Sequence, residues 1–151
     1  MSGPAPAPEA EGTAVRLPRR IATRILAEAQ RGGGREVCGL IGARDGAPVS
    51  LHPVPNAAPD PARRFRMDPR GQIEAMRRMR EAGETLWAIY HSHPQGPARP
   101  SLRDLAEAAY PEAVHLIVSL GTAGVLELAA WRIAGGEARE VPVEIVETGD
   151  G

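Results

Sequence analysis

The stretch Tyr90–Asp104 reads YHSHPQGPARPSLRD and carries two histidines, a serine and an aspartate. The residues just before its histidines, TLWAIY at 85–90, are β-branched, aromatic and aliphatic, and they lie between a glycine and a proline. This pattern predicts a buried strand. Because side chains alternate across a strand, His91 and His93 are expected on one face, roughly 6.5 Å apart at about 3.3 Å per residue.

The residues after the histidines predict a loop that leads into a helix. Prolines and a glycine interrupt residues 94–100, and the apolar positions of LRDLAEAAY at 102–110 have helical spacing. Ser101 is the expected N-cap, with Asp104 in the first turn. Ser-x-x-Asp is also a capping box, which stabilises a helix without any metal, and a His-x-His pair on a strand has structural interpretations too.

Taken together, the strand, the short loop and the helix favour a metal site. They bring two imidazoles and one carboxylate towards one point and leave a fourth coordination position open, which is the pattern of a catalytic zinc site. Hydrolysis at such a site also needs a proton acceptor. Glu36 stands before a short apolar run that ends at Gly42 and predicts another buried strand. Glu36 is therefore either an exposed strand end or a carboxylate kept for chemistry.

The order of these residues resembles the JAMM, or MPN-plus, metalloproteases, whose signature is a distant Glu, then His-x-His, seven residues, Ser, two residues and Asp. Glu36, His91, His93, Ser101 and Asp104 match it at every position, and the resemblance covers roughly residues 15–147. It implies one Zn²⁺ per chain, held by His91, His93 and Asp104. Glu36 would then activate the zinc-bound water, and Ser101 would donate a hydrogen bond to the oxyanion.

The rest of the chain predicts one α/β domain at 15–147, between a disordered tail at 1–14 and a short tail at 148–151. The JAMM resemblance implies a cytidine-deaminase-like sandwich with a mixed, curved β-sheet flanked by helices. Ile73, Met76 and Met79 are expected on one face of the second helix. The predicted helices are 18–31, 69–82 and 102–110, and the predicted strands are 37–41, 49–54, 85–90, 113–120, 125–133 and 138–147, of which the last two form a hairpin.

Composition excludes several classes of function. The net charge of −1 gives no basic footprint for nucleic acid, and one cysteine excludes an internal disulfide. No stretch approaches the roughly 18 apolar residues of a membrane span, and residues 1–14 lack the pattern of a signal peptide. We therefore expect a cytoplasmic protein without a membrane or nucleic-acid partner; whether it forms a homodimer stays open.

The resemblance also suggests a substrate. JAMM enzymes cleave amide or isopeptide bonds at the C-terminal Gly-Gly of ubiquitin-like proteins, and a chain of 151 residues has little room for insertions that hold a second ubiquitin. This favours a ubiquitin-like sulfur-carrier protein that loses cysteine or another small amine. The alternatives are a non-catalytic MPN-type binding scaffold and a RadC-like protein associated with DNA repair.

Three further side chains have open interpretations. Cys38 lies two residues after Glu36 and is either a small buried side chain or a thiol whose oxidation restrains the site. His115 is expected to be a core or strand-end histidine. Phe65 lies in the irregular segment 55–70, which is either a solvated surface or a segment that faces the substrate.

Overall fold

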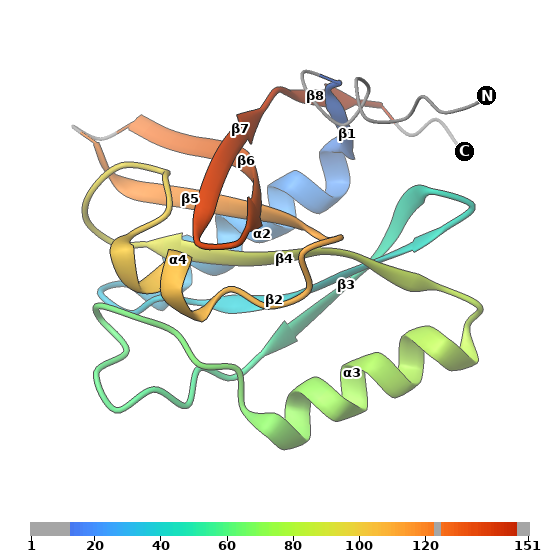
Figure 1. Cartoon of the computed structure of the whole chain (residues 1–151), viewed down its shortest axis with the longest axis horizontal. Helices are drawn as coiled ribbons and strands as arrows, with labels where there is room; N and C mark the ends of the chain where they lie inside the picture. The colour runs from blue at the N-terminus through green and yellow to red at the C-terminus, as the bar shows by residue number, and fades with distance from the viewer. Residues whose placement is uncertain (1–12, 123–124, 148–151) are drawn as a thin grey trace.

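A computed structural model describes residues 13–122 and 125–147 as a mixed sheet with helices on both sides (Figure 1). The main sheet has six strands in the order β3-β2-β4-β5-β6-β7, and β1 pairs with β8 in a separate two-stranded sheet. The elements are β1 Val15–Pro18, α2 Arg19–Gly32, β2 Cys38–Arg44, β3 Ala47–Val54, α3 Pro69–Glu81, β4 Thr85–His93, α4 Leu102–Glu107, β5 Val114–Thr122, β6 Val125–Ala134, β7 Glu137–Val141 and β8 Val143–Val146.

The centre of the sheet is the parallel pair β4 and β5, and every other neighbouring pair in the main sheet is antiparallel. A parallel pair cannot be joined by a tight hairpin, so the chain must cross over between these strands. That crossover is the segment 94–113, which contains α4. The mixed α/β sandwich predicted from the sequence is confirmed.

The C-terminal strand differs from the prediction. The expected strand at 138–147 is divided at Pro142, after which β8 leaves the main sheet and pairs in parallel with β1. Proline has no backbone N–H to donate, so it interrupts the ladder. Its carbonyl instead accepts a hydrogen bond from the Val15 N–H at 2.8 Å. β1 is not predicted from the sequence, because four residues are too few for a recognisable alternation.

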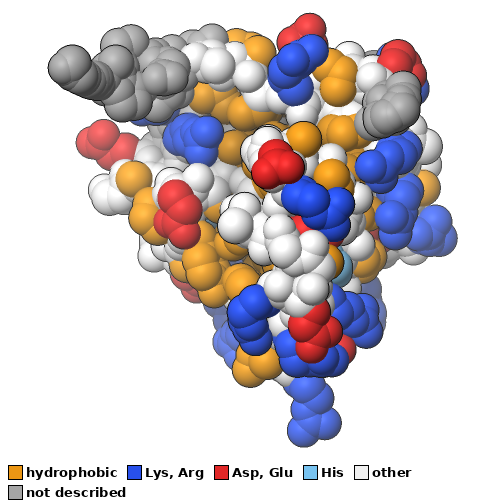
Figure 2. Space-filling model, turned by 90° about the vertical axis from the view of Figure 1, so that its right-hand side faces the viewer, with side chains coloured by type: hydrophobic (Ala, Val, Ile, Leu, Met, Phe, Trp, Pro, Cys, Tyr) orange, Lys and Arg blue, Asp and Glu red, His pale blue; other side chains and the backbone are white. Residues whose placement is uncertain are grey.

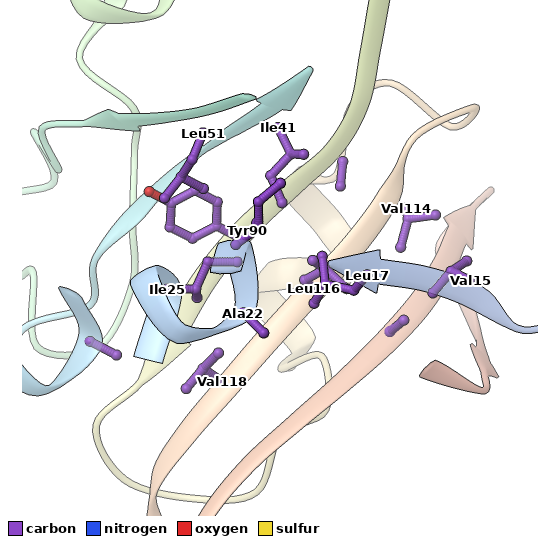
Figure 3. Packing of buried hydrophobic residues seen from close by; sticks show 14 of the residues in the cluster. Val15, Leu17, Ala22, Ile25, Ile41, Leu51, Tyr90, Val114, Leu116 and Val118 are labelled. Atoms are coloured by element: carbon purple, nitrogen blue, oxygen red, sulfur yellow. The ribbon is translucent and has the colours of Figure 1, made fainter. Parts of the chain in front are cut away.

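One face of the main sheet carries the larger apolar core (Figure 3). Ile25 of α2 packs there with Tyr90, Leu116 and Val118 of the two parallel strands. These side chains are at most 1% exposed. Burying a side chain of leucine or isoleucine size stabilises a fold by about 1.5–3 kcal/mol, so this face contributes most of the apolar stabilisation.

The other face carries α3 and a smaller cluster. Ala75 and Met79 of α3 pack on Leu40 and Ile89. The prediction that Ile73 lies on the buried face of this helix is wrong, since Ile73 is 69% exposed. The buried stripe instead follows Ala75 and Met79, one helical turn apart. In Figure 1, α3 lies near the start of β4 and α4 near its end, so α3 does not cover the histidine end of the strand.

The surface shows no broad region of one charge on the side viewed in Figure 2, where basic and acidic side chains are interspersed. On α3, for example, Arg77 forms ion pairs with Glu74 at 2.5 Å and with Glu81 at 2.7 Å. Within the described part of the chain, no helix is both long and apolar enough to cross a bilayer. Residues 1–12 and 148–151 of the two predicted tails lie outside the described residues, and the predicted domain bounds stay a prediction.

Candidate metal centre

The end of β4 presents alternate side chains to two different environments. Tyr90 and Ser92 face the side of α2, whereas His91 and His93 face the other side, with their Nε2 atoms 3.1 Å apart. Ser92 fixes this end of the strand, because its Oγ accepts a hydrogen bond from the Val37 N–H at 2.9 Å and its own N–H donates to the Val37 carbonyl at 3.0 Å. The shared face predicted for the two histidines is confirmed.

Ser101 and Asp104 form the capping box predicted from the sequence. The Ser101 Oγ accepts from the Asp104 N–H at 3.0 Å, and the Asp104 Oδ2 accepts from the Ser101 N–H at 2.9 Å. The helix is shorter than predicted and ends at Glu107, and Tyr110 beyond it has a positive φ of 60°. A positive φ is incompatible with a continuing right-handed helix.

The same Asp104 oxygen also faces both histidines. Asp104 Oδ2 lies 3.2 Å from the His91 Nε2 and 3.1 Å from the His93 Nε2. A tetrahedral zinc ion with bonds of about 2.0–2.2 Å would hold its ligand atoms roughly 3.3–3.5 Å apart. The three atoms form a triangle of nearly that size, and their side chains are at most 9% exposed. The capping and metal-binding interpretations are therefore compatible, since one carboxylate can serve both.

Hydrogen bonding and stacking fix the orientation of the two rings. The His93 Nδ1 lies 2.9 Å from the Pro97 carbonyl oxygen, which directs Nε2 towards the cluster. His91 stacks on Phe65, with ring centroids 4.4 Å apart and an interplanar angle of 23°. Of the two alternatives for Phe65, a surface anchor or a side chain that faces the site, the stacking supports the second.

Glu36 lies just before β2 and is buried, with 5% of its surface exposed. Its carboxylate and the ring nitrogens of His91 and His93 all lie within 4.8 Å of one another. Its Oε1 has no hydrogen-bond partner among the described residues. Burial raises the pKa of Glu36 to about 8, and the nearby His93 offsets part of that rise. Glu36 is therefore a carboxylate that can exchange a proton near neutral pH, and not an exposed strand end.

The three residues of the triangle influence one another electrostatically. Burial opposes ionisation of Asp104, but hydrogen bonds with His91 and His93 outweigh it and lower the pKa of the carboxyl group. Burial lowers the pKa of His91, whereas for His93 the bonds with Asp104 and Pro97 outweigh burial and raise it. Asp104 is thus ionised, as a metal ligand must be, whereas the raised pKa of His93 means that this ring has to release its proton when it binds a metal.

Asn56 is a residue of this site that sequence analysis missed. Its side-chain amide donates to the Glu36 carbonyl at 2.9 Å and to the Arg64 carbonyl at 3.0 Å. Its Oδ1 accepts from the backbone N–H groups of Ala58 and Arg66, both at 3.0 Å. Asn56 therefore joins the backbone of Glu36 to the segment that carries Phe65. In the sequence, an asparagine between prolines signals only a turn.

Cys38 lies beside the site in the sheet, opposite His91 in the register of β2 and β4. Its thiol is fully buried and donates to the Val54 carbonyl at 3.4 Å. Burial raises the pKa of the thiol to about 12, and Glu28 and Glu36 add to the rise. Thiolate formation is what makes a cysteine reactive. These observations favour the small buried side chain over the redox-sensitive thiol.

Two cavities are lined by residues of the triangle of His91, His93 and Asp104. The first, the open groove, has a volume of about 780 Å³ and is lined by Glu36, Arg63, His93 and Ser101, among others. The second, the inner pocket, has a volume of about 350 Å³, and its walls include His91 and Asp104.

Comparison with known proteins assigns the family. Residues 18–134 match the family model Prok-JAB, described as prokaryotic homologs of the JAB domain. A CysO-cysteine peptidase of Mycobacterium tuberculosis is 34% identical over 82% of this chain and 85% of its own. A desampylase of Haloferax volcanii is 33% identical over 80% of this chain and 88% of its own. The chain belongs to the prokaryotic JAB-domain family.

Solved structures agree with this assignment. A protein from Desulfitobacterium hafniense has a TM-score of 0.76 and 31% identity, and the match covers 89% of this chain and 95% of the other. A JAB1/MPN domain protein from Archaeoglobus fulgidus shares the fold with a TM-score of 0.56 at 20% identity, over 87% of this chain and 99% of the other. The protein is a hydrolase of the JAMM type, and the cluster of Glu36, His91 and His93 marks a candidate metal site at the end of β4.

Proposed function

We propose that this protein is a zinc-dependent hydrolase that cleaves the amide or isopeptide bond after the C-terminal Gly-Gly of a ubiquitin-like sulfur-carrier protein. The observation that carries the proposal is the triangle of His91, His93 and Asp104 with the buried carboxylate of Glu36 beside it. The names of three relatives support the substrate class: CysO-cysteine peptidase, probable TtuB-protein conjugate cleaving protease and desampylase.

Zinc is the metal that this donor set fits best. Two imidazole nitrogens and one carboxylate, with one position left open, form a ligand set typical of catalytic zinc. When bound, the ion supplies Lewis acidity, which polarises the substrate carbonyl and makes a water molecule acidic, and its charge favours the ionised form of Glu36.

Glu36 and Ser101 would carry out the chemistry around that ion. Glu36 accepts a proton from the attacking water as the water oxygen bonds to the carbonyl carbon, and it returns the proton to the nitrogen as the carbon–nitrogen bond breaks. The second proton of the water leaves the new carboxylic acid for the amine, so the products are the Gly-Gly carboxylate and the protonated amine. Ser101 accepts a hydrogen bond from Asp104, yet its own hydroxyl hydrogen remains available for the carbonyl oxygen that becomes negative.

The open groove fits the tail of the carrier. Gly33, Gly34 and Gly96 line it and present no bulky side chains, so an extended Gly-Gly segment has space to reach the triangle. Arg63 and Arg99 line the same groove and would favour an acidic carrier surface. Because the carrier body is folded, its tail needs such an open path.

The test is cleavage of a ubiquitin-like carrier that ends in Gly-Gly-Cys. The zinc-loaded protein should release cysteine, whereas Glu36→Gln should bind one zinc and release none. Glu28→Gln is the matched control, because Glu28 is also a glutamate with a pKa raised by burial but contacts Tyr90 on the opposite face of the sheet. Release of cysteine by Glu36→Gln, or no release by the wild-type protein, would overturn the proposal.

The two alternative functions have weaker support. A scaffold without catalysis has no need for a buried carboxylate beside a triangle of metal-ligand type, and a net charge of −1 supplies no basic excess that would favour DNA. Zinc content separates the scaffold from the enzyme, and salt-sensitive DNA affinity would favour the RadC-like alternative. The cytoplasmic location and a homodimer stay predictions.

A further inference from the structure

The loop at 94–100, which joins His93 to Ser101, has few backbone donors of its own. Three of its seven residues, PQGPARP, are prolines and have no N–H to donate. Gly96 has a positive φ of 88°, which interrupts any regular strand or helix. The carbonyl groups of this loop must therefore find donors elsewhere in the protein or in water.

Two side chains outside the triangle supply donors to this loop. The Ser119 hydroxyl of β5 donates to the Gly96 carbonyl, and the Trp131 Nε1–H of β6 donates to the Ala98 carbonyl at 3.1 Å. Ser119 is fully buried, and Ala98 is only 7% exposed although the residues on both sides of it are exposed. The loop is therefore attached to the sheet at two carbonyl groups that lie two residues apart.

The carbonyl between these two attachment points is the one that orients His93. The Pro97 oxygen lies 2.9 Å from the His93 Nδ1, which leaves the Nε2 atom directed towards the triangle. Consecutive Cα atoms are only about 3.8 Å apart, so a shift of either neighbouring peptide is carried to Pro97. Ser119 and Trp131 therefore act on the orientation of His93 through the loop.

The other end of the loop places the second half of the site. Residue 100 is followed directly by Ser101, the N-cap of the box that contains Asp104. The Asp104 Oδ2 lies 3.1 Å from the His93 Nε2. A metal site requires each ligand distance to lie within about 0.2 Å of its usual value. The attachment of the loop therefore controls both a histidine from the strand and a carboxylate from the helix.

A purely structural role for Trp131 would depend on its ring and not on its N–H. Trp131 is half-buried and lines a surface cavity together with Pro97 and Ala98, so the ring also covers apolar surface. A phenylalanine ring would cover most of this surface but has no donor, and the Ala98 carbonyl would lose its partner. A substitution of Trp131 by phenylalanine therefore separates positioning from packing.

We propose that Trp131 and Ser119 are positioning residues of the metal centre, which hold the 94–100 loop so that His93 and Asp104 meet at one ion. Their hydrogen bonds determine how tightly the site binds its metal and with what geometry. The inference rests on the proposed zinc site. It adds two residues, from strands that carry none of the signature residues, to the set that forms this site.

The test measures metal binding by the folded protein, which a residue that only stabilises the fold should not change. Competition with a chromophoric chelator gives the Kd for zinc. Trp131→Phe should weaken zinc binding about tenfold and Ser119→Ala about 10–100-fold, the range found for outer partners of metal ligands. The visible absorption of Co²⁺-loaded Trp131→Phe should also differ from that of the wild-type protein, because these bands report the coordination geometry.

Two control variants make the same chemical changes away from the loop. Trp87→Phe removes an indole N–H from another half-buried ring, which packs against the larger apolar core. Ser50→Ala removes a hydroxyl that donates to Glu84 at 2.5 Å, just before β4 begins and away from its histidine end. Both controls should keep the wild-type Kd for zinc and the wild-type Co²⁺ spectrum. Urea unfolding of the metal-free variants measures how much stability each one loses.

The outcomes separate this inference from the proposed function. A wild-type Kd for zinc and an unchanged Co²⁺ spectrum in Trp131→Phe would overturn the positioning role and leave the hydrolase intact. Equal weakening of zinc binding in the controls would also overturn it, since a general loss of stability would then explain the effect. If the wild-type protein binds no zinc, the zinc site and this inference both fail. Should Ser119→Ala not fold, Trp131→Phe decides alone, because one aromatic ring there replaces another.

Discussion

The two faces of β4 differ at its C-terminal end, although they belong to the same nine-residue strand. On one face, Ala88 and Tyr90 pack into the core beneath α2. On the other, His91 and His93 face Asp104 across 3.1–3.2 Å. The first face contributes to the stability of the fold, and the second carries the side chains of the candidate metal site. Because strand side chains alternate, a slip of one residue in register would exchange the two faces and destroy both.

This difference predicts where substitutions should affect stability and where they should affect activity. Side chains that face α2 contribute mainly burial, whereas the polar side chains opposite them cost desolvation unless a metal and hydrogen bonds compensate for it. Substitutions on the two faces should therefore separate folding from catalysis.

The largest effect is expected on the polar face. His91→Ala should lose zinc and lower kcat/KM by more than about 10⁴-fold, because both the Lewis acid and the acidified water depend on the metal. Elemental analysis measures the zinc content, and cleavage assays measure kcat/KM. The matched control is Tyr90→Phe, the neighbouring residue, which should keep zinc and activity. Equal losses in both variants would show that the faces are not independent.

The next effect is expected in the core. Leu116→Ala should lower the free energy of unfolding by about 2–5 kcal/mol, because Leu116 is fully buried and its truncation leaves a cavity. Urea denaturation measures the loss. Below the unfolding transition, kcat and zinc content should stay at wild-type values, and a large fall in kcat of the folded variant would contradict the separation.

Ser101 belongs to both functions, so its replacement should have two effects. Ser101→Ala should lower kcat by about 10²–10³-fold through loss of an oxyanion donor. It should also destabilise α4 by about 0.5–2 kcal/mol through loss of the cap. Asp68→Ala is the control, because Asp68 caps α3 by accepting from the Gly71 N–H at 2.9 Å. If the control loses as much activity, the effect of Ser101 is only structural.

The smallest effect is expected from pH. Burial lowers the pKa of His115 to about 4 in the folded protein. Between pH 6.5 and about 4 the unfolded chain binds a proton at this residue that the folded chain does not, so stability falls as the pH falls. Urea unfolding of the metal-free protein should show a smaller fall for His115→Gln than for the wild type. An equal fall in the free energy of unfolding of the two proteins would contradict this role of His115.

Much of the site could be predicted because its chemistry is local in sequence. The two histidines and the capping residues lie within fifteen positions, and strand alternation and helix capping place them with few alternatives. Glu36 is distant, and only the resemblance to the JAMM signature connected it to the others. Its burial and its raised pKa depend on tertiary packing.

The remaining features depend on contacts that sequence patterns do not record. Asn56 acts through four hydrogen bonds to backbone groups, and backbone partners leave no trace in residue types. Ile73 fits the helical stripe but is exposed, because the orientation of α3 on the sheet selects Ala75 and Met79. The pairing of β8 with β1 joins the two ends of the domain, beyond the range of any local pattern.

The most direct test of the metal centre is the position of zinc in a crystal of the zinc-loaded protein, located by anomalous scattering. We predict one ion at about 2.0–2.2 Å from the Nε2 atoms of His91 and His93 and from the Oδ2 of Asp104, with the Glu36 carboxylate one hydrogen bond from the fourth ligand. Direct coordination by Glu36 with Asp104 outside the ligand set, or an ion bound elsewhere, would contradict the account.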